Sequence, residues 1–427
     1  MTYVQTITGL ACGCDAADPS AGIVSIDEAL DRIAAHVAPV SGTVRVGLAE
    51  ARGRVLAEPV LALSDMPRFD HAAMDGYALR RSDLAGPGPW RLPVALRCAA
   101  GEAAVSPLPP GSAARIFTGA PLPAGADCVV MQEEIDGGPR QIVLHRRPAA
   151  HENIRFRAEE RRQGGEIVAA GLPVSPRAIA AAAASGHAHL VVRRRLRVAL
   201  LVSGSEVAAP GRQGLGAADI WDVNTPMLRA MLARPDIDLV AVETVPDSPG
   251  GIRAALERAS RGADLVITTG GVSVGEEDHL RGAVRALDGR EVFAGVAIKP
   301  GKPVAFGRLD RALWLGLPGN PQSAFVTWTL FGEAILGHLS GLAAPVGTRR
   351  HVVLAHPLHR KPGRCEIRAA ALVGIDGHGR ETADCGEAVH SGQVGALCAS
   401  DGLVFLPADA DHLPQGALVE FLPLRMT

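Results

Sequence analysis

Three acidic residues, Glu206, Asp247 and Asp278, follow separate strand-like or glycine-rich segments of the chain. Because each segment belongs to a predicted parallel sheet, we expect the three carboxylates at one sheet edge, where ligands bind in such folds. Carboxylate oxygens suit a hard divalent cation, and without a cation the clustered charges would repel one another. The three residues are therefore candidate metal ligands. The alternative is three unrelated surface acids, since acidic side chains usually face solvent.

The stretch from Asp264 to Pro321 contains three short apolar runs, each of which ends in a glycine-rich turn. Glycine lets the backbone turn tightly and present N–H groups to an anion, and a helix predicted over 276–287 would add its N-terminus. The stretch is neither a dinucleotide fingerprint nor a P-loop, and purely structural turns remain an alternative. We interpret it as a cradle for a phosphorylated ligand, with two lysines in a proline-stiffened loop. The candidate substrate-binding residues are Gly270, Gly271, Ser273, Gly275, Lys299, Lys302, Pro318, Asn320 and Ser323.

Two further loops carry polar side chains beside glycine, Asp75 before Gly76 and Thr118 before Gly119. Both loops interrupt a region of short strand-like runs, and ligand-binding groups concentrate on loops that strands hold in place. For Asp75 the alternative is a turn in which the carboxylate caps its own backbone.

The elements that must position these residues alternate between strands and helices from Arg197 onward. The pattern predicts strands near 197–203, 237–245 and 264–268, with helices over 224–233 and 249–260 between them. Such alternation indicates a doubly wound parallel sheet with right-handed crossovers. The helix over 224–233 is expected to be capped by the segment Asp222-Val-Asn-Thr-Pro.

The fold class expected for the whole chain is multidomain α/β plus β. The predicted parts are a flexible tail (1–22), a split linker or dimerisation domain of α+β type (23–45 plus 153–195), an inserted β-barrel-like domain (46–152), the α/β domain (196–343) and a C-terminal β domain (344–427). Ser25 followed by Glu28 predicts a capped helix at the start of the split domain.

Bulk composition excludes several classes of function. The 427 residues are 47% hydrophobic and 21% charged with a net charge of −2, so a basic nucleic-acid-binding surface is not expected. No apolar stretch approaches the roughly 20 residues that a membrane span needs, and no signal peptide is visible. The seven cysteines are scattered, which favours a reducing cytoplasm.

Two groups of potential metal-binding side chains lie outside the candidate site. Cys12 and Cys14 form a weak metal signal without a second ligand pair. His351, His356 and His359 are interpreted as exposed residues of the C-terminal strands, with metal binding as the minority interpretation.

Together these residues resemble the molybdopterin molybdenumtransferase family, which includes the bacterial MoeA proteins and the gephyrin E domain. The resemblance covers nearly everything from residue 25 to the C-terminus. It rests on five motifs: Ala73-Met-Asp-Gly-Tyr-Ala, Phe117-Thr-Gly-Ala-Pro with Val129-Val-Met-Gln-Glu, Thr269-Gly-Gly-Val-Ser-Val-Gly-Glu-Glu-Asp, Lys299-Pro-Gly-Lys-Pro and Leu317-Pro-Gly-Asn-Pro.

The resemblance implies an elongated homodimer and a magnesium-dependent reaction in which adenylylated molybdopterin and molybdate give molybdenum cofactor and AMP. A molybdopterin adenylyltransferase and molybdoenzymes are implied as possible partners. Family function maps onto Asp75, Thr118, Asp247 and Asp278 as catalytic residues, onto Glu206 with the last two as metal ligands, and onto the two lysines.

The chain departs from the family pattern at Ser205, Glu160 and the segment 390–393. These differences keep a non-catalytic carrier or scaffold for the cofactor open as an alternative. A second alternative is the related molybdopterin adenylyltransferase activity, which would leave the inserted and C-terminal β domains unexplained.

Overall fold

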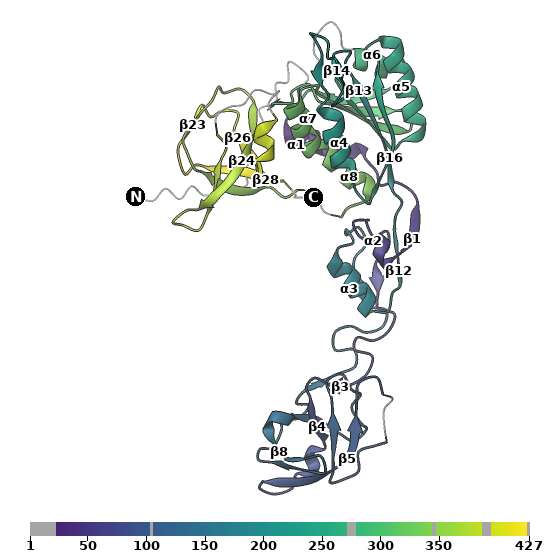
Figure 1. Cartoon of the computed structure of the whole chain (residues 1–427), viewed down its shortest axis with the longest axis vertical. Coiled ribbons are helices and arrows are strands. Elements are labelled where there is room, and N and C mark those ends of the chain that lie inside the picture. Colours follow the sequence, from purple (N-terminus) through teal and green to yellow (C-terminus); the bar gives the residue numbers. More distant parts are fainter. Residues whose placement is uncertain (1–22, 103–105, 271–278, 344–346, 387–393, 425–427) are drawn as a thin grey trace.

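The computed structural model describes residues 23–102, 106–270, 279–343, 347–386 and 394–424. The molecule is elongated (Figure 1), with the α/β and C-terminal domains at one end and the inserted β domain at the other. A slender connecting part, built around β1, β12, α2 and α3, joins the two ends. The candidate residues Gly271, Ser273, Gly275 and Asp278, as well as Cys12 and Cys14, lie outside the described residues.

The α/β domain is built on a six-stranded sheet with the strand order β16-β13-β17-β21-β20-β18. Four strands run parallel: β13 (Leu196–Ser203), β16 (Ile237–Val245), β17 (Leu265–Thr269) and β21 (Ala312–Leu317). The buried, apolar runs of β13, β17 and β21 suit strands covered on both faces, whereas β16 lies at the edge of the sheet and is partly exposed. The predicted doubly wound sheet is therefore confirmed.

The three apolar runs between Asp264 and Pro321 were predicted to form parallel strands with their carboxyl ends at one sheet edge. One of them does not. The run after Lys302 forms β20 (Ala305–Leu309), which pairs antiparallel with β21 and with β18 (Arg290–Ala294). Only Asp310 and Arg311 separate β20 from β21. A connection this short can join only antiparallel strands, because a parallel pair needs a crossover of a dozen or more residues.

Helices cover both faces of this sheet. On one face α5 (Pro249–Gly262) and α6 (His279–Ala286) bury their apolar residues against β13 and β17. The opposite face is covered by helices that share the largest hydrophobic core of the chain, namely α1 (Ile26–His36), α4 (Asn224–Leu232), α7 (Pro321–Thr327) and α8 (Glu333–Ser340). A short π-helix, η5 (Trp328–Gly332), connects α7 to α8.

Helix α1 packs in the α/β domain and not in the split domain to which the sequence assigns residues 23–45. Its N-cap is as predicted, because the Ser25 hydroxyl accepts a hydrogen bond from the Glu28 N–H at 3.1 Å. Its apolar stripe, Ile26, Ala29 and Ile33, is fully buried in the core that the α/β sheet also lines. An amphipathic helix takes its place from the apolar surface that buries its stripe, and here the sheet supplies that surface.

The connecting part is formed by segments from both sides of the insertion. Strand β1 (Thr43–Gly47) pairs antiparallel with β12 (His189–Arg193), and β2 (Val60–Leu61) pairs with β11 (Glu166–Val168). Helices α2 (Leu48–Ala51) and α3 (Pro176–Ala184) cover these strands with a small core of their own. The chain thus leaves and re-enters the same unit.

The inserted domain is a six-stranded sheet with the order β7-β4-β6-β5-β9-β8. The strands are β4 (Gly76–Leu79), β5 (Trp90–Cys98), β6 (Ala113–Ile116), β7 (Cys128–Met131), β8 (Ile135–Gly138) and β9 (Gln141–Leu144). A short ribbon of β3 (His71–Ala72) and β10 (Ile154–Arg155) closes the domain towards the connecting part. Residues just after 152 therefore pair with the inserted domain.

The C-terminal domain is a closed β structure, because β24 (Cys365–Ile375) pairs with both β25 (Glu381–Asp384) and β26 (Gly402–Leu406). The other strands are β22 (Arg350–Leu354) and β28 (Leu418–Pro423). One strand from the α/β domain, β19 (Ile298–Lys299), adds to β24. This pairing fixes the Lys299 loop against the C-terminal domain. Within the part of the chain that the structure describes, no helix is both long and apolar enough to cross a membrane.

Candidate functional site

A pocket of about 370 Å³ opens at the carboxyl ends of the parallel strands of the α/β domain. Strand β13 lies between β16 and β17, so the chain changes direction across the sheet between β13 and β17. This is the switch point at which doubly wound folds bind ligands. The pocket is lined by Val202, Ser203, Gly204, Glu206, Val207, Ile220, Trp221, Asp222, Val223, Asn224, Asp247, Thr269, Gly270, Pro303, Pro318, Gly319, Asn320 and Pro321.

Two of the three predicted metal ligands, Glu206 and Asp247, line this same pocket. Glu206 follows β13 after a turn at Gly204, whose φ of +143° favours glycine, and Asp247 follows β16. The third, Asp278, lies outside the described residues. Among the residues that are described, no group of three or more His, Cys, Asp and Glu side chains is placed to hold a metal ion. Carboxylate oxygens are the ligands that a partly hydrated magnesium ion takes, so the chemistry of these two side chains suits such an ion.

Gly270 forms the floor of the pocket and cannot be replaced there by a larger residue without rearrangement. Its φ is +88°, and a Cβ atom at this position would lie 2.2 Å from the carbonyl oxygen of Ser203. The backbone of the turn after β17 therefore approaches the end of β13 closely. Gly270 lines the pocket, and its role in binding a ligand stays a prediction.

The turn after β21 contributes two of its three predicted residues. Pro318 and Asn320 line the pocket, and α7 begins directly after them. Ser323 is 4% exposed inside α7 and is not among the described residues that line the pocket. It lies in the first turn of that helix.

Trp221, Asp222 and Asn224, which were not predicted from the sequence as site residues, also line the pocket. Asp222 also accepts a hydrogen bond from the Thr225 N–H at 2.9 Å, as the predicted cap requires. The segment Asp222-Val-Asn-Thr-Pro therefore both caps α4 and contributes to the pocket. Only its capping role was predicted from the sequence. Trp221 is 45% exposed at the pocket, which leaves its ring available to a planar group.

Asn224 is the most constrained polar residue of the pocket. Its Nδ2 donates to Thr269 Oγ1 at 2.9 Å and to the Gly319 carbonyl at 2.7 Å, which orients the amide. The residue is 8% exposed, and its Oδ1 has no hydrogen-bond partner among the described residues. A buried acceptor without a partner is costly unless a ligand or water donates to it.

Neither of the two predicted lysines lines the pocket, although Pro303, next to Lys302, does. Lys299 Nζ lies 3.5 Å from Glu366 Oε2 of the C-terminal domain, so the proposed oxyanion-binding lysine already has a carboxylate partner.

Glu366 is surrounded by more positive charge than it can neutralise. Arg368 Nε lies 2.9 Å and Arg360 Nε 3.5 Å from its carboxylate, in addition to Lys299. Burial alone would raise the pKa of Glu366, but Arg368, then Lys299 and Arg360, hold this pKa below its usual range. Three cations around one carboxylate leave a net positive cluster where the α/β and C-terminal domains meet.

Asp75 and Thr118 are brought together, but far from the pocket. Thr118 donates to Asp75 Oδ1 from both its backbone N–H and its Oγ1, each at 2.7 Å. The carboxylate therefore does not simply cap its own backbone. Hydrogen bonds from the Thr118 backbone and then its side chain lower the pKa of Asp75. Strand β4, which follows Asp75, lies at the opposite end of the molecule from β13 (Figure 1).

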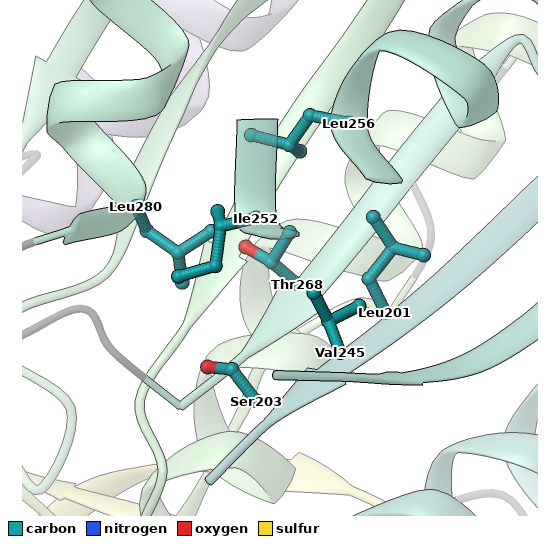
Figure 2. A pocket seen from close by; sticks show the side chains of 7 residues that line it. All are labelled: Leu201, Ser203, Val245, Ile252, Leu256, Thr268 and Leu280. Carbon is teal, nitrogen blue, oxygen red and sulfur yellow. The ribbon is translucent and has the colours of Figure 1, made fainter. Parts of the chain in front are cut away.

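A second, much smaller cavity lies between the sheet and α5 and α6 (Figure 2). It measures about 10 Å³ and is lined by Leu201, Ser203, Val245, Ile252, Leu256, Thr268 and Leu280. This volume is at the lower limit for one water molecule, and most of the lining is aliphatic. It is a packing defect and no ligand site.

Comparison with known proteins gives consistent relatives along nearly the whole chain. One family model, described as the MoeA N-terminal region (domain I and II), matches residues 24–186, and another, a probable molybdopterin binding domain, matches residues 199–338. Molybdopterin molybdenumtransferase 2 of Mycobacterium tuberculosis is 34% identical over 397 residues, which is 91% of this chain and 97% of that protein. The molybdopterin molybdenumtransferase of Haemophilus influenzae is 35% identical over 323 residues, 75% of this chain and 78% of that protein.

Solved structures agree with the fold. A molybdopterin biosynthesis MoeA protein from Pyrococcus horikoshii superposes with a TM-score of 0.80 at 27% identity and covers 94% of this chain and 100% of its own. The multidomain architecture expected from the sequence is thus confirmed by a structure that matches it from end to end.

Proposed function

This chain belongs to the MoeA family of molybdopterin molybdenumtransferases, and on that premise we propose that it converts adenylylated molybdopterin and molybdate into molybdenum cofactor and AMP. In this reaction one water molecule cleaves the phosphoanhydride bond between the pterin phosphate and AMP, and two sulfur atoms of the pterin replace two oxygens of molybdate, which leave as water. The observation that carries the proposal is the pocket at the switch point, which combines two carboxylates with a glycine floor.

Glu206 and Asp247 are proposed to hold a magnesium ion together with Asp278, which the family motif supplies. Such an ion, when bound, would polarise the anhydride and stabilise negative charge on the departing AMP. The protein's own contribution is to present carboxylate oxygens from two different strand ends around one cavity. Gly270 lets the turn after β17 pack closely against the end of β13, and this contact shapes the pocket.

Asn224 and Trp221 are proposed to position the organic part of the substrate. The unpaired Oδ1 of Asn224 can accept a hydrogen bond from an amino or hydroxyl group of the ligand. The exposed ring of Trp221 can stack on a heteroaromatic ring, such as the adenine or the pterin. Trp221 lies shortly before α4 and Asn224 is its first residue, and both line the pocket.

The positive cluster around Glu366 is proposed to attract molybdate to the edge of the pocket. Lys299, with about half of its side chain exposed, is the accessible member, while Arg360 and Arg368 are buried. Excess positive charge in a partly desolvated place attracts an oxyanion more strongly than a solvated lysine alone would. Lys302 would add a second positive charge in the same loop.

Asp75 and Thr118 are proposed to act at the pocket of a partner subunit in a homodimer. The elongated shape keeps these two residues away from the pocket of their own chain. Mixed dimers test this idea: one subunit carries Asp75→Ala and the other Asp247→Ala. Trans action leaves one complete site in such a mixed dimer, so recovery of about half of the activity of the parent dimer supports it, whereas a mixed dimer as inactive as either single-variant dimer contradicts it.

The reaction itself is tested by incubating the full chain with adenylylated molybdopterin, molybdate and magnesium. We expect AMP release together with reconstitution of an apo-molybdoenzyme. Tight ligand binding without AMP release would indicate the carrier function that Ser205 and Glu160 keep open. Consumption of ATP with unmodified molybdopterin would indicate the adenylyltransferase activity.

A further inference from the structure

Two histidines of the C-terminal domain face each other across a short β ribbon. The ribbon consists of β23 (Leu358–His359) and β27 (His412–Leu413), which pair antiparallel with His359 opposite His412. Their ring centroids lie 4.5 Å apart with an interplanar angle of 32°. The two residues are 53 positions apart in the sequence, so only the fold brings them together.

The backbone hydrogen bonds show which kind of pair this is. The Arg360 N–H donates to the Asp411 carbonyl at 2.8 Å, one residue beyond His359 and one before His412. This pattern makes His359 and His412 a non-hydrogen-bonded cross-strand pair, the kind in which opposite side chains approach each other most closely. Both imidazoles therefore project from the same face of the ribbon at short range.

The ribbon is held in place from its other face. Leu358 is buried, and Leu413 packs against the same C-terminal core. The Arg360 side chain is also buried, and its Nη1 donates to the Pro407 and Ala410 carbonyls. Both histidines, in contrast, are exposed. The two imidazoles are thus exposed to solvent on an anchored backbone. Little conformational entropy is therefore lost when both rings bind one ion.

We propose that His359 and His412 form a bidentate site for a transition-metal dication of borderline softness, such as Zn²⁺, Ni²⁺ or Cu²⁺. Imidazole nitrogen is a preferred ligand for these ions, whereas Mg²⁺ requires oxygen ligands. The site is therefore chemically distinct from the carboxylate pocket of the α/β domain. No third His, Cys, Asp or Glu among the described residues completes a closed site, so the remaining coordination positions are open to water or to an incoming ligand.

The site predicts a characteristic dependence on pH. An imidazole must be neutral to bind a metal, so protons compete with the ion and metal affinity should fall in acid. A site made of carboxylates would retain its affinity to lower pH.

The test uses the full chain and Ni²⁺ or Cu²⁺ alone, with binding measured by calorimetry. His359→Gln and His412→Gln should each weaken binding of one metal equivalent by roughly tenfold or more, and the double variant should lose little beyond either single one, because chelation needs both rings. With Cu²⁺, electron paramagnetic resonance should report two nitrogen ligands in the parent protein and fewer in each variant.

His351→Gln is the matched control. His351 is an exposed histidine of the same domain, but it stands opposite Glu420 and not opposite another histidine. Its replacement should leave the metal equivalent unchanged. The parent and its four variants should unfold at similar temperatures without metal, since the replaced rings are exposed. Equal affinity and stoichiometry in the parent and the double variant, or an equal loss in His351→Gln, would overturn the proposal.

Discussion

Asp75 and Thr118, which are 43 residues apart, form a two-point contact in which one carboxylate oxygen accepts both the backbone N–H and the hydroxyl of the threonine. The contact keeps the carboxylate ionised, because both donors favour its charged form. Asp75 is therefore an anion whose orientation is set by the neighbouring loop. Its free oxygen, Oδ2, is left to face a partner or ligand.

Replacement of Thr118 by valine should raise the pKa of Asp75, because one of the two donors is lost while the backbone donor remains. Thr118→Ser keeps a hydroxyl and serves as the control. Carboxyl chemical shifts, followed by NMR as pH is lowered, measure the effect. Because the folded pKa is depressed, the stabilising contact is fully present above the unfolded pKa of about 3.9 and is lost as pH falls through the folded value. An identical titration in all three proteins would show that the hydroxyl is irrelevant.

Asp247→Asn should reduce AMP release by about a hundredfold or more, because a carboxylate that holds a catalytic cation supplies several kcal/mol of transition-state stabilisation. Glu206→Gln should act in the same direction and raise the magnesium concentration needed for half-maximal rate. The control is Asp238→Asn, an exposed acid at the opposite end of the same strand. If Asp247→Asn and Asp238→Asn have equal turnover, Asp247 has no part in the site.

Asn224→Ala should lower the affinity for AMP and destabilise the fold by roughly 1–2 kcal/mol, because Thr269 Oγ1 and the Gly319 carbonyl lose a donor. Calorimetry with AMP and urea unfolding measure the two effects. Thr225→Val is the matched control: its hydroxyl is also buried without a described partner, but the residue does not line the pocket. Removal of that hydroxyl should be neutral or slightly stabilising, and a loss of AMP affinity equal to that of Asn224→Ala would argue against a specific role.

Glu366→Gln should lower the free energy of unfolding by about 3 kcal/mol at neutral pH, because it leaves the buried Arg360 and Arg368 without a counter-charge. The folded pKa of Glu366 is depressed, so its contribution is present above the unfolded pKa of about 4.3 and disappears as pH falls through the folded value. The difference between parent and variant should therefore shrink in acid.

The control for Glu366 is Glu381→Gln in the same domain. Glu381 forms an exposed pair with Arg350 at 3.0 Å, and such pairs contribute about 0–1 kcal/mol. Urea unfolding of the three proteins over a series of pH values separates the two cases. A variant at Glu366 as stable as the one at Glu381 would show that the cluster tolerates an uncompensated charge.

The sequence by itself determined the local elements and much of the pocket. Strand 237–245 was predicted at its observed limits, and the Ser25 cap was correct, because periodicity and capping depend on residues that are close together in the chain. Glu206, Asp247, Gly270, Pro318 and Asn320 were expected at one edge, since a doubly wound sheet brings its strand ends together whatever the details of packing.

Only the tertiary structure decided which residues complete each site. The sequence predicted only a helix cap around Asn224. In the structure, its amide bridges Thr269 and Gly319 at the pocket. Strand β19 pairs the Lys299 loop with the C-terminal domain. His359 lies opposite His412 in a ribbon whose register no local sequence pattern specifies. Helix α1 joined the α/β core for the same reason. Contacts between distant segments depend on which apolar surfaces are available for burial, and a linear pattern does not state that.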